Sequence, residues 1–291
     1  MRITDRIIQR GMVEDIHRQL AAMNRLQEQI ASGSRVNSLS DDPVRAARSV
    51  SLNAAHASLE QHRNTAQEGL SWMNATLASL GTARQTIQTA RTNAVQGATD
   101  TQTDETREVL AIAVDQLSAQ LLDTANAKWN GSSLFAGNKT TTAAFSTAGV
   151  YQGDTGTMTR DIAPGETTVV NLTGKEVFVD GENSIQVLAD LKTALSNNDG
   201  SAVRALLPRL DNALNQLLKL EAELGSEAKR VETTLERLDE LEVNLMDRIS
   251  TNDDTDMPRA LVDLQNANTL YEASLKASSA LFKTTLLDFM Q

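Results

Sequence analysis

Apolar residues recur every three or four positions along most of the chain, which is the spacing of one face of an α-helix. This spacing first runs from Val13 to Ile30, ahead of Gly33, a residue type suited to end a helix. It continues over residues 43–95, breaks in the polar stretch 97–104, and resumes to about Lys128. We therefore predict three helices here, the second of them roughly 75 Å long at 1.5 Å per residue.

The second half of the chain returns to helical spacing. Helices are predicted over residues 184–195, over 201–249, and from the end of the polar stretch 251–258 to about residue 289. Along the helix over 201–249, the seam positions alternate steps of four and three without a slip. These positions are Leu210, Leu214, Leu217, Glu221, Leu224, Ala228, Val231, Leu235, Leu238, Glu242, Leu245 and Ile249. Such sustained spacing is typical of a coiled coil.

Residues 137–181 follow a different pattern. This stretch is rich in Thr, Val and Gly, and turn pairs such as Pro164-Gly165 and Asp180-Gly181 separate short β-favouring runs. We therefore predict a small β domain inserted between the helices.

The predicted fold is mainly α: a long antiparallel helical coiled-coil bundle formed by both chain ends, with a small inserted β domain. We expect three parts. Residues 1–42 and 255–291 supply terminal helices, residues 43–136 and 184–254 form a helical rod, and residues 137–183 form the β domain. Because the order of elements is similar when read from either end, we expect the two terminal helices to lie together.

Composition narrows the range of functions. The chain has 38 acidic and 27 basic residues and a net charge of −11, which argues against binding to nucleic acid or to an anionic membrane. Cysteine is absent, so disulfides, thiolate metal sites and cysteine nucleophiles are excluded. We see no secretory signal peptide and no run of about 18 apolar residues that would span a membrane. We expect no cofactor, no nucleic-acid partner and no membrane partner.

The adjacent carboxylates Asp41 and Asp42 are the most conspicuous candidate for chemistry. Carboxylates that act as acid and base usually face each other across a cleft from separate elements, whereas these two are neighbours at a predicted helix start. Asp42 followed by Pro43 is typical of a helix N-cap followed by the first helical residue. We therefore interpret the pair as a boundary between helices.

The other titratable clusters have poor spacing for a site. Asp253, Asp254 and Asp256 lack the central Gly and the distant Glu of a calcium loop, and Asp256 is interpreted as a cap of the last helix. No two histidines are three or four residues apart, the spacing that aligns two ligands on a helix. The histidines are His17, His56 and His62. We predict no catalytic and no metal-binding residue, and hence no enzymatic activity.

The terminal helices carry apolar seams that need a partner surface. One possibility is a hairpin core within a single chain, and the other is an interface completed by neighbouring copies. Because a two-helix pair has little interior, we favour shared burial between copies. The predicted self-assembly residues are Val13, Ile16, Leu20, Met23, Ile30, Leu264, Tyr271, Leu275, Phe282 and Phe289.

Motifs at both ends resemble the bacterial flagellin family. Residues 31–38 read ASGSRVNS and precede Asp41 and Asp42, which resembles the N-terminal signature of that family. Near the other end, Leu264-Gln265-Asn266-Ala267 and Leu286-Leu287-Asp288-Phe289 resemble its C-terminal region. The resemblance assigns Arg35, Asn37, Asp41 and Asp42 to the signature loop.

Motifs in the middle of the chain distinguish among members of the family. Asn130-Gly131, Leu134-Phe135-Ala136-Gly137 and Tyr151-Gln152-Gly153-Asp154 resemble the members at the hook–filament junction, the third hook-associated proteins, more than filament flagellin. With the two ends, the resemblance covers nearly the whole chain.

The resemblance implies an extracellular structural protein of the bacterial flagellum, exported without a cleaved signal peptide. It implies a ring of identical copies between the hook-side junction protein and flagellin, and a flagellar export chaperone as a further partner. The terminal helices would form the inner tube of the ring. Filament flagellin and a free coiled-coil adaptor or export chaperone remain as alternatives, and a hydrolase using Asp41 and Asp42 is the least favoured.

Overall fold

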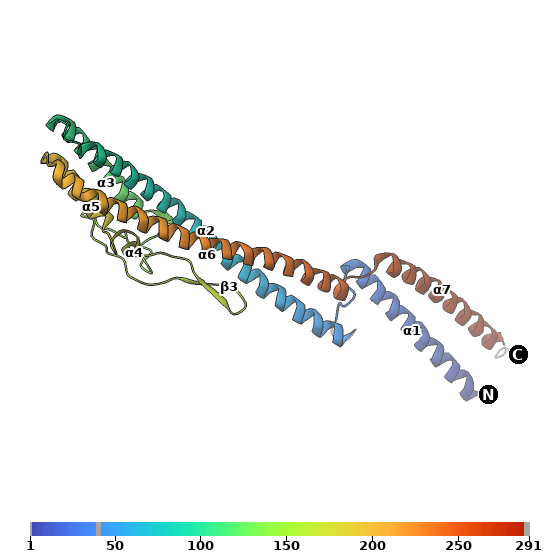
Figure 1. Cartoon of the computed structure of the whole chain (residues 1–291). Helices are drawn as coiled ribbons and strands as arrows, with labels where there is room; N and C mark the ends of the chain where they lie inside the picture. The colour runs from blue at the N-terminus through green and yellow to red at the C-terminus, as the bar shows by residue number, and fades with distance from the viewer. Residues whose placement is uncertain (1, 39–41, 288–291) are drawn as a thin grey trace. The chain divides into compact units, whose positions relative to one another are not determined.

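The computed structural model describes residues 2–38 and 42–287 and shows a mainly α protein (Figure 1). The chain forms two compact units: unit 1 contains residues 1–58 and 241–291, and unit 2 contains residues 59–240. The long helices α2 (Pro43–Gly97) and α6 (Gly200–Asp253) contribute to both units. The division into three domains drawn from the sequence stays a prediction.

Unit 1 contains both terminal helices. Helix α1 (Arg2–Ser32) and helix α7 (Met257–Leu287) lie side by side and run antiparallel (Figure 1). The expectation that the two terminal helices lie together is therefore confirmed.

Unit 2 contains the hydrophobic core. Helices α2 and α6 pack with α3 (Asp104–Ala125) and α5 (Ser184–Ser196), and α3 lies along α5. The predicted α6 seam is buried within this unit at Leu210, Leu214, Leu217, Leu224, Ala228, Val231, Leu235 and Leu238. The facing side of α2 is buried at Ala66, Met73, Leu80, Ala83, Ile87, Ala90 and Ala94. The predicted coiled-coil packing is confirmed here, and alanines on α2 leave room for leucines on α6.

A polar residue in the seam of α6 has a specific partner. Glu221 lies at a seam position and accepts a hydrogen bond from the Arg84 side chain on α2, with Nε and Oε2 3.0 Å apart. A second arginine of α2, Arg91, pairs with Asp211 of α6. Because both pairs are partly exposed at the edge of the packing, they fix the register of the helices more than they add to stability.

The inserted region contains less β-structure than predicted. The strands are β1 (Lys128–Trp129), β2 (Ser132–Ser133), β3 (Thr159–Ala163) and β4 (Glu166–Val169). One short antiparallel hairpin, β3–β4, lies within residues 137–183, a second hairpin, β1–β2, precedes them, and most of the remaining backbone is irregular. In the β3–β4 hairpin, Thr159 pairs with Val169 and Asp161 with Thr167.

A short helix, α4 (Gly174–Phe178), was not predicted from the sequence. Thr173 caps it, because the threonine hydroxyl accepts from the Glu176 amide while the Glu176 carboxylate accepts from the Thr173 amide. This reciprocal capping box satisfies two amides that would otherwise lack partners at the start of the helix.

Aromatic side chains form the core of the inserted region. Phe135, Phe145 and Phe178 are fully buried and meet edge to face, and Phe145 also contacts Tyr151. The Tyr151 hydroxyl donates to the carbonyl oxygen of Asp154 at 2.6 Å and lies 3.1 Å from that of Phe135. Burial, together with the nearby carboxylate of Asp154, raises the pKa of Tyr151 to about 12. The Tyr151 hydroxyl therefore stays protonated and donates to a backbone carbonyl of its own motif, residues 151–154.

A buried arginine fixes the turns at one end of unit 2. The Arg107 side chain donates to the carbonyl oxygens of Gly97 and Thr99 at 2.9 Å, and also to the side chain of Asn198. Asn198 lies in the turn before α6 and has a φ of +53°. Arg107 thereby ties the α2–α3 turn to the α5–α6 turn.

Two neighbouring leucines of α6 provide a test of the core. Leu217 is 1% exposed and Leu218 is 49% exposed. Leu217→Ala should lower the free energy of unfolding by about 2–5 kcal/mol, because it leaves a cavity in the seam. Leu218→Ala should change it by about 0.5 kcal/mol or less. Urea unfolding followed by circular dichroism measures both, and equal effects would contradict the assigned seam.

Candidate functional site

The signature loop lies where the terminal helices join the long helices of unit 1. Gly33 ends α1 with a φ of +70°, a conformation that glycine adopts without strain. Its carbonyl oxygen accepts from the Thr255 amide at 2.9 Å, and the Arg35 amide donates to the Asp253 carbonyl oxygen at 2.6 Å. The loop after α1 is therefore paired, by backbone hydrogen bonds, with the segment that precedes α7.

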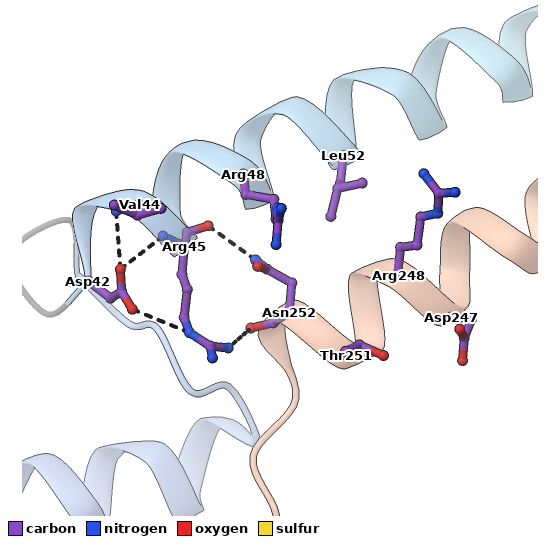
Figure 2. Close-up of a pocket in the computed structure, with 9 residues that line it drawn as sticks. All are labelled: Asp42, Val44, Arg45, Arg48, Leu52, Asp247, Arg248, Thr251 and Asn252. Carbon is purple, nitrogen blue, oxygen red and sulfur yellow. Dashed lines mark hydrogen bonds and ion pairs between the residues drawn. The ribbon is translucent and has the colours of Figure 1, made fainter.

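Asp42 caps α2, as predicted. One of its carboxylate oxygens accepts from the amides of Val44 and Arg45 at 3.1 and 2.9 Å. Its other oxygen pairs with the Arg45 guanidinium at 3.3 Å, and Pro43 is the first residue of the helix. Figure 2 shows these contacts at the start of α2. The Asp42 carboxylate is occupied in holding the helix start.

Asn252, near the end of α6, is a structural residue that the sequence reading missed. Its side chain is buried and donates to the Arg45 carbonyl oxygen at 3.1 Å (Figure 2). It also donates to the Asp253 carboxylate at 2.8 Å. In return, the Arg45 guanidinium donates to the Asn252 carbonyl oxygen at 3.2 Å. Ser49 adds a hydrogen bond to the Asp253 carboxylate at 2.7 Å. These contacts join the first turns of α2 to the last turn of α6.

An open groove lies between α2 and α6 beside these contacts. Its volume is about 680 Å³, and its lining residues are Asp42, Val44, Arg45, Arg48, Leu52, Asp247, Arg248, Thr251 and Asn252. Figure 2 shows Arg48 and Arg248 extending from opposite helices toward this space, which Asp247 also lines. Arg48 and Arg248 have no ion-pair partner among the residues that the structure describes.

The predicted signature residues lie in different environments. Arg35 and Asn37 are exposed, and the Arg35 carbonyl oxygen accepts from the Gln29 side chain at 2.9 Å. Asp42 lines the groove, and Asp41 lies outside the described residues. In the described part, the loop is thus a connector held through its backbone and through Asp42.

The predicted seam of α1 faces α7 but is incompletely covered. Ile16, Leu20, Met23 and Ile30 are half-buried, and Val13 is 45% exposed.

On α7, Leu264 and Tyr271 are half-buried, and Leu275 is 43% exposed. The side chain of Phe282 lies outside the described part of the structure, and so does the whole of Phe289. Every predicted seam residue that can be examined thus keeps part of its surface accessible.

The face that α7 presents to α1 is made largely of small residues. Its less exposed positions are Ala260, Leu264, Ala267, Tyr271, Ser274 and Ser278. Small side chains allow two helices to approach closely but bury little apolar area. Larger apolar residues of α7 point elsewhere: Leu261, Val262 and Leu270 are 53%, 59% and 59% exposed.

Several other titratable residues singled out from the sequence make local structural contacts. Asp256 caps α7 by accepting from the Arg259 amide at 3.2 Å, as predicted, and Asp254 bonds to Ser250. His56 lies 3.6 Å from the Glu242 carboxylate. Over residues 2–38 and 42–287, no three metal-binding side chains of His, Asp or Glu cluster together. Within the same ranges, no helix combines the length and apolar content needed to cross a bilayer.

Comparison with known families matches both ends of the chain. Residues 3–140 match the family described as "Bacterial flagellin N-terminal helical region", and residues 207–290 match "Bacterial flagellin C-terminal helical region". Together the two regions cover most of the sequence, including the signature loop and the predicted seams.

Individual relatives and solved structures agree with these matches. "Flagellar hook-associated protein 3" of Salmonella typhimurium is 30% identical over 262 residues, which cover 80% of this chain and 82% of the relative. The crystal structure of Bacillus cereus FlgL aligns with a TM-score of 0.61 at 21% identity, covering 69% of this chain and 99% of that one. The flagellar junction protein FlgL from Legionella pneumophila aligns with a TM-score of 0.59 at 16% identity, covering 72% and 100%. The two structures share the fold of this chain.

The cap at Asp42 can be tested by substitution. Asp42→Ala should destabilise the first turn of α2 by about 0.5–2 kcal/mol, whereas Asp42→Asn should retain most of the cap because asparagine is also a good N-cap. Amide exchange at Val44 and Arg45, the two amides that Asp42 accepts from, should become faster in the alanine variant alone. Unchanged exchange in Asp42→Ala would refute the capping role.

Proposed function

This chain belongs to the bacterial flagellin family, and we propose that it is the structural protein that joins the hook to the filament and seats the first layer of flagellin. The support is the relative named flagellar hook-associated protein 3, which aligns over most of both chains. The motifs around Leu134–Gly137 and Tyr151–Asp154 also favour the junction members over filament flagellin.

The observation that carries an assembly role is the contrast in burial between the two units. Among the described side chains, the buried apolar residues of unit 1 are Ala46 and Ala260 only, while unit 2 buries Leu, Ile, Val, Phe and Met side chains throughout. The part of unit 1 that the structure describes therefore has little buried apolar core in a single copy. Large apolar side chains remain exposed on its helices, including Val44 at 77% and Val243 at 71%.

Neighbouring copies would supply the missing burial. Covering one large apolar side chain contributes about 1.5–3 kcal/mol, so the predicted seams can add substantial stability when copies assemble. Fixing each residue of the terminal helices costs about 1–2 kcal/mol in backbone entropy, so the helices depend on that added burial. We propose that assembly and the ordering of the terminal helices are coupled.

The proposed partners follow from this role. They are other copies of the chain in a ring, the hook-side junction protein, flagellin, and an export chaperone before assembly. The proposed location is the extracellular flagellum. The role is structural and non-enzymatic, and the proposal involves no cofactor.

Deletion of the gene tests the role in the flagellum. Cells that lack this protein should keep their hooks and shed flagellin into the medium, because the filament has no seat, and they should lose motility. Electron microscopy of hooks and immunoblotting of the medium measure the two effects. A complemented strain is the control. Normal filaments in the deletion strain would contradict the junction role, and filament loss without flagellin export would point to an export chaperone.

Amide exchange of the isolated monomer tests the coupling between assembly and folding. Residues 10–30 and 262–287 should exchange quickly, because half-covered helices open readily, whereas the buried seam of unit 2 should be protected. Analytical ultracentrifugation of the same sample establishes that it is monomeric. Equal protection of the terminal helices and the unit 2 seam in a monomer would rule out assembly-coupled ordering.

A further inference from the structure

The groove between α2 and α6 has features of a docking surface for an acidic helix. Arg48 and Arg248 reach into it from opposite sides, and Leu52 lies on the α2 side between them (Figure 2). The neighbouring Arg45 is already paired with Asp42 and the Asn252 carbonyl oxygen. Three arginines and two aspartates therefore line one open space, and two of the arginines, Arg48 and Arg248, have no ion-pair partner among the described residues.

Exposed apolar side chains lie on both helices that form the groove. Val44 lines the groove and is 77% exposed, and Val50, further along α2, is 69% exposed. On α6, Val243 and Met246 are 71% and 49% exposed. Cationic groups beside exposed apolar side chains suit a partner helix that carries carboxylates next to apolar residues.

The chain itself carries an acidic helical segment, in which Leu235 and Leu238 are buried and Leu241 is the apolar side chain left exposed, at 48%. Residues 232–242 of α6 read ETTLERLDELE, with five acids and one arginine. Glu236 and Asp239 of this segment are exposed and lie one turn apart on the helix. Within one copy, Asp239 is nine residues from Arg248 on the same helix, about 13 Å along its axis, so it is too far away to neutralise that arginine.

We propose that the Arg48–Arg248 groove of one copy binds the Glu236–Asp239 segment of a second copy of this chain. The inference rests on the proposed assembly role and identifies a charged contact within it. Because the two surfaces consist of different residues, the contact is heterologous, and repetition of a heterologous contact generates a closed ring or an open helix. Each copy carries both the groove and the acidic segment, so the same contact can repeat from one copy to the next around a ring.

The absence of cysteine in the chain permits a direct cross-linking test. Thr251 lines the groove, and the exposed Thr233 lies one turn before Glu236. A chain carrying both Thr251→Cys and Thr233→Cys, expressed in the deletion strain, should give cross-linked multimers when isolated flagella are treated with a short bis-maleimide. Each single-cysteine chain is the control and should give none.

Charge reversal in this double-cysteine chain tests the ionic contact. Arg48→Glu with Arg248→Glu should reduce the cross-linked product by about tenfold or more, because like charges then face each other. Adding Glu236→Arg and Asp239→Arg to the same chain should restore the product. Lys128→Glu, an exposed site on unit 2, is the control for a change in net charge and should have no effect.

The outcomes separate this inference from the proposed function. Flagella that keep their filaments but give no cross-link, or a cross-link unaffected by charge reversal, would overturn the docking contact while leaving the junction role intact. Loss of the product without restoration by the charge swap would also overturn it. If circular dichroism shows that the reversed chain is unfolded, Arg48→Gln with Arg248→Gln provides the same test with a smaller reduction. Filaments retained in the full deletion strain would instead refute the proposed function.

Discussion

Two helices packed side by side have almost no interior, and this constraint governs the structure of both units. In unit 2 the constraint is met within the chain, because α3, α5 and the inserted region cover the seam between α2 and α6. In unit 1 no such cover is present among the described residues, and small residues mediate much of the contact between α1 and α7. The same sequence pattern therefore gives a self-sufficient core in one unit and an incomplete one in the other.

Polar contacts supplement the sparse apolar burial in the described part of unit 1. The Asp42 cap, the reciprocal hydrogen bonds of Arg45 and Asn252, and the backbone pairing of the signature loop fix how the helices of this unit begin and end. Such contacts are directional, so they define geometry while contributing modestly to stability. The helices of unit 1 are thus fixed at their ends, while their faces remain partly exposed.

Most of the helical architecture could be predicted because its causes are local. The spacing of apolar residues marks the seam of α6, and Asp42 and Asp256 cap helices where the sequence places them. Helix α4 was missed although Thr173 and Glu176 have the spacing of a capping box, because the surrounding composition favours strands.

The groove could not be foreseen for a different reason. Arg48 and Arg248 are 200 residues apart, and their approach depends on the packing of α2 against α6. The face of α7 that packs on α1 was equally hard to predict, because Ala267 and Ser274 are small residues and do not stand out in a pattern of large apolar side chains. Tertiary proximity of this kind leaves no local trace in the sequence.

The buried Arg107 has a mechanical consequence. It ties the α2–α3 turn to the α5–α6 turn, at the ends of α2 and α6 that are remote in sequence from the terminal helices. Tension applied to either end of the polypeptide would therefore unfold the partly covered terminal helices before it loads the hydrogen bonds of Arg107. Unfolding under tension would thus proceed from the chain ends along α2 and α6 toward the two turns that Arg107 joins.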